Sequence, residues 1–359
     1  MTVSVVIPTF NRARLVVRAV ESALDQRGVE TEVIVVDDGS TDDTERALKP
    51  FADRIRYIKQ ENRGVVAARN RGMELAAKPF IALLDSDDTW LPWKLALQLR
   101  CFELFPELML TWTNCFEVDG TGAVLQSDFL RKYQAAAYRH FTDSDLFQRV
   151  VSIDCPAAPE GTTVDLKIGR MASPLFMGNL IVTPTAVFRR EALSVGMFDP
   201  EMGQAGEDYD LFWRMADLGP FGLADVPAMY FRRGGSDHLH TARRQMAVSN
   251  LKAIAKYHKR HPQGPALNER LVATRMTEAH AWVATAAFDD GRVREARRHA
   301  VAAALRGSRQ PRVYIYLLLS LLPRRVTSIA RWTVHRLKGL RRGGAPAATI
   351  AEAAPGARS

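Results

Sequence analysis

Short apolar runs and longer amphipathic segments alternate along the first hundred residues. The apolar runs at residues 3–7, 32–36, 56–58 and 80–84 have the length of strands, and the first two are rich in Val and Ile. The segments that follow them, ending at residues 24, 48, 76 and 99, place apolar side chains at helical spacing. Strands that alternate with helices of this length predict an α/β domain with a mostly parallel central sheet.

The middle of the chain has a less regular pattern. Residues 108–114 indicate another strand, and Asp119-Gly120-Thr121-Gly122 is typical of a hairpin turn. Residues 126–170 show weak periodicity, so we interpret them as an insertion or a mobile loop. Strand character resumes at residues 179–188, and residues 189–193 favour a short helix.

The pattern becomes helical from residue 243 to residue 342. One helix pair surrounds Asp289-Asp290-Gly291, but a single pair is not a repeat array. Residues 313–322 are strongly apolar but too few to span a bilayer. Residues 325–340 have one apolar face among basic residues, which fits an interfacial helix or a helix docked on the domain. The Ala-, Gly- and Pro-rich residues 343–359 predict disorder.

The composition adds a charge asymmetry to this picture. The 359 residues are 47% hydrophobic and 25% charged, which fits one large globular domain with an appendage. The net charge is +9, yet the segment from Arg297 to Ala351 holds twelve Lys or Arg and no Asp or Glu, which leaves −3 for the rest. A basic C-terminal region of this kind binds anionic lipid or nucleic acid, or stays solvated.

Cysteine usage and the N-terminus indicate a cytoplasmic protein. The three cysteines, Cys101, Cys115 and Cys155, form no Cys-x-x-Cys pair, which favours a reducing compartment. The chain begins directly with a strand pattern instead of a signal peptide, and no window reaches the roughly 18 apolar residues of a transmembrane helix.

An acidic cluster, Asp85-Ser86-Asp87-Asp88, follows the apolar run at residues 80–84. Three carboxylates within four residues repel one another, and a hard divalent cation such as Mg²⁺ or Mn²⁺ relieves that repulsion. A solvated acidic turn is the alternative. The carboxyl ends of parallel strands share one edge, where open α/β sheets bind ligands, so this position favours a metal site.

Two further polar stretches follow strands of the same predicted sheet. Pro8-Thr9-Phe10-Asn11 ends the first strand, with Asn11 as the expected N-cap of the next helix. Asp37-Asp38-Gly39-Ser40 ends the second, where carboxylates also suit a turn or a helix cap. Threonine hydroxyls and carboxylates at this edge can hydrogen-bond the edge of a nucleotide base.

A second acidic motif lies at Gly206-Glu207-Asp208-Tyr209-Asp210, and the residues after it predict a helix. Acidic residues at a helix N-terminus stabilise the helix by about 0.3–1 kcal/mol, so their presence does not require a catalytic role.

Four motifs together resemble those of the family 2 glycosyltransferases in order and spacing. They are residues 5–11, residues 36–40, Gly64-Val65-Val66-Ala67-Ala68-Arg69-Asn70, and Asp85-Ser86-Asp87-Asp88. The resemblance covers about residues 3–235 and implies the GT-A fold, in which a nucleotide-binding α/β half is fused to an acceptor-binding half. It divides the chain into a domain at 1–240, with a nucleotide-binding half at 1–105 and an acceptor half at 106–240, a helical basic region at 241–342, and the tail.

The resemblance also implies donor and metal contacts. Pro8, Thr9 and Asp38 would contact the base of a nucleotide-diphosphate sugar, most simply a UDP-sugar. Arg69 would pair with phosphate or base, unless it is a solvated helical arginine. Asp85 or Asp87 would meet the ribose or the sugar, and Asp87 or Asp88 would bind Mn²⁺ or Mg²⁺ at the diphosphate.

The second acidic motif resembles the Glu-Asp motif of the same family, whose Asp is the general base of inverting transfer. Asp208 matches that position, and Glu207 and Asp210 are acceptor contacts or second choices. Many relatives carry Tyr-Arg-x-His downstream, but this chain lacks that His after Arg232. His238 or His240 can take its place as a metal or diphosphate ligand, or can be an ordinary surface residue.

The expected protein is therefore a cytoplasmic glycosyltransferase that transfers one sugar at a time to a hydroxyl of a glycan or of a lipid-linked glycan. The Gln-x-x-Arg-Trp motif of processive relatives is absent, since Ser328 precedes Arg331-Trp332. The basic region would place the enzyme on the inner face of an anionic membrane, and no nucleic-acid partner is expected. Two alternatives are a non-catalytic carbohydrate- or nucleotide-binding module, and a sugar nucleotidyltransferase, which needs a Gly-rich basic loop after its first strand.

Overall fold

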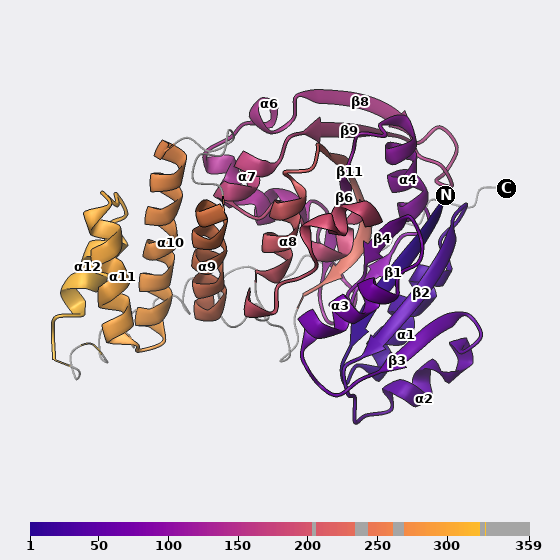
Figure 1. Cartoon of the computed structure of the whole chain (residues 1–359), viewed down its shortest axis with the longest axis horizontal. Helices are drawn as coiled ribbons and strands as arrows, with labels where there is room; N and C mark the ends of the chain where they lie inside the picture. The colour runs from indigo at the N-terminus through magenta and orange to yellow at the C-terminus, as the bar shows by residue number, and fades with distance from the viewer. Residues whose placement is uncertain (203–205, 234–242, 261–268, 324–326, 328–359) are drawn as a thin grey trace. The chain divides into compact units, whose positions relative to one another are not determined.

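The computed structural model describes residues 1–202, 206–233, 243–260, 269–323 and 327, and its secondary structure is drawn in Figure 1. The strands are β1 (Thr2–Thr9), β2 (Glu30–Asp37), β3 (Ile55–Lys59), β4 (Phe80–Leu83), β5 (Thr89–Trp90), β6 (Leu110–Val118), β7 (Val124–Gln126), β8 (Arg149–Asp154), β9 (Thr163–Gly169), β10 (Val187–Arg189) and β11 (Phe221–Arg232). The helices are α1 (Ala13–Leu24), α2 (Thr44–Leu48), α3 (Val65–Leu75), α4 (Lys94–Leu104), α5 (Phe129–Tyr133), α6 (Asp143–Leu146), α7 (Ala172–Met177), α8 (Glu207–Met215), α9 (Arg243–Arg260), α10 (Glu269–Asp289), α11 (Val293–Leu305) and α12 (Pro311–Leu319). Five 3₁₀ helices complete the description: η1 (Lys49–Phe51), η2 (Gln134–Arg139), η3 (Thr183–Thr185), η4 (Arg190–Val195) and η5 (Pro200–Met202).

The chain divides into two compact units, Met1–Met276 and Thr277–Ser359. The first contains one mixed sheet in the order β3-β2-β1-β4-β10-β6-β11-β9-β8, with β5 paired to β11 and β7 paired to β6. Strands β3, β2, β1 and β4 are mutually parallel, as are β6 and β11, whereas β10, β9 and β8 pair antiparallel. The mostly parallel core expected for the α/β class is confirmed.

Strands β1 and β4 are buried on both faces, which explains their continuous apolar runs. Helices α1 and α3 both pack against β1 and β2. The approach of α3 is close, because a Cβ at Gly72 would lie 2.3 Å from a methyl group of Val6. The local sequence pattern and the tertiary packing favour the same structure in this half of the sheet, so the loops that follow its strands have well-defined positions.

Residues 126–170 depart from the expectation of an insertion or mobile loop. They form α5, η2 and α6, then the antiparallel pair β8 and β9, and β9 extends the main sheet through β11. The expected strand at 179–188 is also largely wrong. Only Val187–Arg189 is a strand, and Pro184 lies in the 3₁₀ turn η3, where it needs no ladder hydrogen bond.

Asn11 is not the N-cap of α1, because that helix begins at Ala13 after Arg12. The Asn11 side-chain oxygen instead accepts hydrogen bonds from the backbone N–H groups of Thr41 (2.8 Å) and Asp42 (3.3 Å). The asparagine therefore joins the loops after β1 and β2. Asp119 forms the expected hairpin turn, since its N–H donates to the carbonyl of Ala123 at 3.0 Å.

The second unit is a small helical assembly with an alanine-rich core. The buried side chains of α10, α11 and α12 form its two clusters: Ala281, Ala284, Ala300, Ala303 and Val313 in one, and Ala287, Phe288, Ala296 and Tyr316 in the other. The predicted helical character is confirmed for the described part of this region. The predicted segment at 325–340, apart from residue 327, and the predicted disordered tail lie outside the described residues.

Among the helices that the structure describes, none is both long enough and apolar enough to cross a membrane.

Candidate active site

The carboxyl ends of β1, β2 and β4 lie at one edge of the sheet, as the strand pattern predicts. Thr9 is in register with Asp37, and the Asp38 N–H donates to the Thr9 carbonyl at 2.9 Å. The Leu84 N–H donates to the carbonyl of Val6 at 3.0 Å, which places the acidic cluster that follows beside the end of β1. Residues from three separate motifs therefore meet at this edge.

The Asp38 carboxylate organises the loop that leads into α3. It is buried and accepts hydrogen bonds from the Gly64 N–H (2.7 Å), the Arg63 N–H (2.9 Å) and the Gln60 side-chain amide (2.7 Å). Gly64 has φ 86°, a left-handed conformation that glycine adopts without strain. Asp37 has a similar task, because it accepts from the Ser40 N–H (2.7 Å) and the Tyr57 hydroxyl (2.6 Å). The turn chemistry that the sequence allowed is present at Asp37, whereas Asp38 holds a loop that lies 22 to 26 positions further along the chain.

The end of β1 offers a buried polar atom to this edge. Thr9 is buried, and its hydroxyl oxygen has no hydrogen-bond partner among the described residues. A buried hydroxyl without a partner costs free energy, so this position favours a ligand that hydrogen-bonds there. Pro8 precedes it within β1, paired in register with Val36.

The three carboxylates of the acidic cluster have different surroundings. Asp85 pairs with Arg69 at 2.7 Å, and Asp87 pairs with Arg12 at 2.8 Å. Asp88 is buried and accepts from the Arg232 N–H at 2.8 Å, but its Oδ2 has no partner among the described residues. Burial, together with Asp87 and Asp85, raises the pKa of Asp88 well above its ordinary value. The cluster is thus a set of individually placed oxygens and not a solvated turn.

Arg69 brings the two acidic motifs together. Its guanidinium pairs with Asp85 on one side and with Glu207, 138 positions away along the chain, on the other, both at 2.7 Å. Burial alone would lower the pKa of Arg69, but the two carboxylates hold it above its ordinary value. The arginine is buried, so the alternative of a solvated helical arginine is wrong.

Glu207 and Asp208 begin α8 directly after Gly206, which has φ 87°. Burial and the neighbouring Asp208 raise the pKa of Glu207 to about 7, although Arg69 opposes the shift. Burial also raises the pKa of Asp208, while Arg69 and hydrogen bonds lower it. Asp208 is half-buried whereas Glu207 is buried, so Asp208 is the more accessible member of the pair.

Residues from the loop before β10 surround the Asp208 carboxylate. Its Oδ2 accepts from the Thr183 hydroxyl at 2.9 Å and from the Asn179 side-chain amide at 3.4 Å, and its Oδ1 accepts from the Tyr209 N–H at 2.7 Å. The Asn179 amide also donates to the Tyr133 hydroxyl at 3.0 Å. These contacts orient the carboxylate within a polar network.

Asp210 has a structural environment instead. It is buried and pairs with Arg214 at 2.8 Å within α8. Arg214 also donates to the carbonyls of Val195 and Met197, so the pair joins α8 to the end of η4 and to the residues that follow it. This placement favours Asp208 over Asp210 as the reactive carboxylate.

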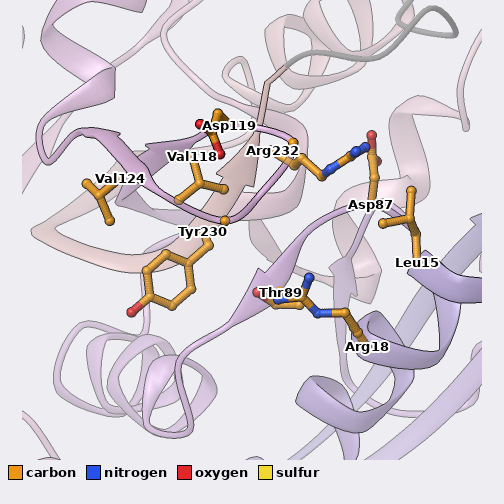
Figure 2. A pocket seen from close by; sticks show the side chains of 11 residues that line it. Leu15, Arg18, Asp87, Thr89, Val118, Asp119, Val124, Tyr230 and Arg232 are labelled. Atoms are coloured by element: carbon orange, nitrogen blue, oxygen red, sulfur yellow. The ribbon is translucent and has the colours of Figure 1, made fainter. Parts of the chain in front are cut away.

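A pocket of about 290 Å³ opens beside Asp87 (Figure 2). Arg18 of α1 and Arg232 of β11 line it, together with Tyr230. Figure 2 shows the Arg232 side chain extending toward Asp87. Two guanidinium groups beside the acidic cluster suit an anionic group such as a phosphate.

The metal prediction rests on Asp87, Asp88 and His238. Among the described residues, no group of three or more His, Cys, Asp or Glu side chains could hold a metal ion by itself. His238 and His240 lie outside the described residues. Asp87 and Asp88 fit a site completed by substrate, because Mg²⁺ is commonly held by one or two carboxylates with phosphate oxygens and water.

Sequence reasoning did not single out Arg12, Asn179, Thr183 or the pocket-lining role of Arg232. Arg12 directly follows the polar loop at residues 8–11, which was a usable signal. Asn179 and Thr183 had none, because they lie in a segment whose strand pattern was misread and which is 25 or more positions from Asp208.

The sequence of this chain is similar to those of known glycosyltransferases. Residues 4–154 match the model of Glycosyl transferase family 2. The validoxylamine A glucosyltransferase of Streptomyces hygroscopicus subsp. jinggangensis is 34% identical over 223 residues, which are 59% of this chain and 50% of that protein. The matched stretches cover between 18% and 50% of the first five curated relatives, so this chain corresponds to only part of their length.

Two solved structures share the fold at low sequence identity. The structure of TarS residues 1–349 from S. aureus, in complex with UDP-GlcNAc, has a TM-score of 0.57 at 17% identity and covers 96% of this chain and 92% of its own. The mannosyltransferase PcManGT from Pyrobaculum calidifontis, in complex with GDP-Man and Mn²⁺, has a TM-score of 0.54 at 20% identity, with coverage of 95% and 88%.

Proposed function

This chain belongs to glycosyl transferase family 2 and has the GT-A fold, and from that premise we propose that it transfers a single sugar from a nucleotide-diphosphate sugar to a hydroxyl of a growing glycan. The observation that carries the proposal is the Arg69 bridge between Asp85 and Glu207. It unites an acidic cluster suited to a metal and a diphosphate with a carboxylate pair suited to proton transfer. Transfer of a sugar between a diphosphate and a hydroxyl needs both at one place.

The nucleotide-binding half at 1–105 supplies the donor contacts in this proposal. Thr9 and Asp38 contact the base, and Asp85 or Asp87 contacts the ribose or the sugar. The orphaned Thr9 hydroxyl supports this assignment, as does the position of all these residues at the edge where α/β sheets bind ligands. A UDP-sugar is the proposed donor, in keeping with the UDP-GlcNAc bound to the TarS structure.

Asp87 and Asp88 would hold Mn²⁺ or Mg²⁺ at the diphosphate. The carboxylate oxygens present fit a hard cation, and the buried Asp88 Oδ2 has no other described partner. When bound, the cation supplies positive charge that offsets the repulsion between diphosphate and carboxylates and stabilises the leaving group. His238 is proposed as a further ligand.

Donor binding should therefore depend on a divalent cation. We expect EDTA to lower UDP affinity by about tenfold or more, measured by isothermal titration calorimetry with and without Mn²⁺. Asp87→Asn should mimic the loss in the presence of Mn²⁺, because an amide binds the cation less well. Asp43→Asn, at an exposed carboxylate of the same unit, is the matched control and should leave affinity unchanged. Equal affinity with Mn²⁺ and with EDTA would contradict the metal assignment.

Asp208 is the proposed general base. It takes the proton of the acceptor hydroxyl as that oxygen attacks C1 of the sugar, and the bond from C1 to the diphosphate breaks on the opposite side, which inverts C1. Its raised pKa suits a proton acceptor, and its hydrogen bonds to Thr183 and to the Tyr209 N–H hold the carboxylate in place within the acceptor half at 106–240. Thr183 and Asn179 are positioning residues in this scheme.

Thr183→Val should move the acid limb of the pH–rate profile to higher pH. The Thr183 hydroxyl donates to the Asp208 carboxylate and so lowers its pKa, and the loss of this hydrogen bond should raise that pKa further. A base must be deprotonated to act, so activity would then require a higher pH. UDP release from the donor, measured across pH, reports the shift.

Two variants control this experiment. Thr183→Ser keeps the hydroxyl and should restore the profile. Thr185→Val removes a hydroxyl of the same 3₁₀ turn that donates only to the Val182 carbonyl, and should leave the profile in place. The groups that also face Asp208, namely Arg69, Glu207, Asp85 and Tyr133, are unchanged in all three variants. An unshifted profile in Thr183→Val would show that the hydroxyl does not tune the base.

The proposed function as a whole is tested by a thermal-shift screen of nucleotide-diphosphate sugars with and without Mn²⁺, followed by UDP or GDP release from each ligand that stabilises the protein. A glycosyltransferase should release the nucleoside diphosphate slowly in water and faster with an acceptor glycan. Binding without any release would favour a non-catalytic module. Release of pyrophosphate from a nucleoside triphosphate and a sugar phosphate would favour a nucleotidyltransferase.

A further inference from the structure

One face of helix α12 exposes large apolar side chains. Its members, called here the α12 outer face, are Tyr314, Ile315, Leu318, Leu321 and Leu322, with exposed fractions between 43% and 65%. Their spacing follows the helix and the turn that continues it, in which the Leu321 N–H donates to the Leu318 carbonyl. Leu305, at the end of α11, is 84% exposed. So many exposed apolar side chains within one short segment mark an interaction surface.

The opposite face of α12 already supplies the core of this unit. Val313 packs in the cluster with Ala281 and Ala300, and the Tyr316 ring stacks on Phe288 at 4.6 Å between centroids. The Ser320 carbonyl, also on the buried side, accepts from the Arg297 guanidinium. The helix therefore has its packing partners within the unit, and the outer face is additional apolar surface beyond what the fold requires.

Positive charge accompanies this apolar face. Arg306, Arg309 and Arg312 are exposed and immediately precede it. The chain has no Asp or Glu between Arg297 and Ala351, so no acidic side chain of that segment offsets them. An apolar face with arginines beside it matches a surface that is apolar inside and anionic outside.

We propose that residues 305–322 dock this protein on an anionic lipid bilayer, with the α12 outer face among the acyl chains and Arg306, Arg309 and Arg312 at the headgroups. A second copy of the chain is a poorer match, because two such surfaces would bring six guanidinium groups together. Helix α12 has 9 residues and would lie in the interface, since a spanning helix needs roughly 20. The docking surface is distinct from the residues assigned to donor and acceptor chemistry.

The test uses the full chain and vesicles of phosphatidylcholine alone or mixed with phosphatidylglycerol, with co-sedimentation as the readout. We expect binding to the anionic vesicles that weakens in high salt. Ile315→Glu with Leu318→Glu should lower the partition coefficient by about tenfold or more, because two side chains that would insert among the acyl chains become charged. Arg309→Glu with Arg312→Glu should lower it by a similar factor on anionic vesicles only.

Leu125→Glu with Val150→Glu, at two equally exposed apolar positions of the first unit, is the matched control and should bind as the unaltered protein does. Thermal unfolding of each variant checks that it is folded. We expect all of them to fold, because the altered side chains are exposed. Undiminished vesicle binding by both the α12 variant and the arginine variant would overturn the proposal. Failure of the unaltered chain to bind anionic vesicles would also overturn it. If the only effect of the α12 variant were to convert a dimer to a monomer, the α12 outer face would be a contact between copies of the chain, and the proposal would be wrong.

Discussion

Asp208→Asn is expected to lower the rate of sugar transfer by about 10²–10⁴-fold while UDP affinity stays nearly unchanged. The amide keeps the shape of the side chain and can keep the contact with Thr183, but it cannot accept the proton of the acceptor hydroxyl. The Asp208 carboxylate accepts hydrogen bonds from Thr183, Asn179 and the Tyr209 N–H, which are not assigned to the donor, so donor binding should be undisturbed. Transfer is measured as nucleoside diphosphate release with an acceptor, and affinity by calorimetry.

Two neighbouring carboxylates provide the comparison for this variant. Asp210→Asn removes the charged partner of Arg214 within α8. It should therefore lower the free energy of unfolding and leave the pH–rate profile nearly in place. Glu207→Gln weakens the contact with Arg69 and should affect donor binding as well as rate, because Arg69 also holds Asp85. Near-normal turnover in Asp208→Asn combined with loss of turnover in Glu207→Gln would assign the base to Glu207.

Arg69→Met is expected to lower the free energy of unfolding by about 3–5 kcal/mol, measured by urea denaturation. The substitution leaves the buried Glu207 carboxylate without its ion-pair partner, and the side chain of Asp85 loses its partner as well. The main cost lies in the buried Glu207 carboxyl, which must stay charged without a partner or take up a proton, because Arg69 no longer lowers its pKa. Methionine can fill much of the volume of arginine, so lost packing is the smaller cost. Adding Glu207→Gln should recover part of the loss, because the second variant removes the carboxyl.

Arg71→Met provides the matched control on the same helix. Arg71 pairs with Glu74 at 3.2 Å, and both side chains are about half exposed. Exposed pairs of this kind contribute about 0–1 kcal/mol, so this variant should unfold near the unaltered protein. Arg69→Lys should rescue little, because an ammonium group cannot span two carboxylates as a guanidinium fork does. Equal stability of Arg69→Met and Arg71→Met would contradict the account of the buried bridge.

The first hundred residues show how far a local pattern predicts this fold. Strands β1 and β2 are nearly continuous apolar runs because helices cover both faces of a parallel sheet, and such runs are visible without any tertiary information. The polar residues after β1, β2 and β4 predicted an edge that contains Thr9, Asp38 and Asp85, and the parallel pairing of β1 with β2 and with β4 places these strand ends side by side. The ends of α1, α2 and α3 lie within one residue of the predicted ends, whereas α4 continues to Leu104, beyond the predicted end at residue 99.

The segment from 126 to 188 shows where the same approach fails. The pair β8 and β9 is stabilised by pairing with β11, more than 50 positions away along the chain, and much of β8 is exposed. A strand whose pairing partner lies far along the chain and whose two faces are partly solvated has little local signature. Thr183 and Asn179 lie in this segment, so the network around Asp208 could not be predicted either.

The sequence by itself determined the α/β class, the resemblance to a glycosyltransferase family, and the identity of the acidic residues at the site, because each depends on residue type and spacing along a short stretch. Only the tertiary structure decided which partner each carboxylate has. Arg69 lies between Asp85 and Glu207, Arg12 meets Asp87, and Thr183 meets Asp208. Such pairings join residues between 16 and 138 positions apart. They are set by how the loops at one sheet edge pack together, and no local pattern records that packing.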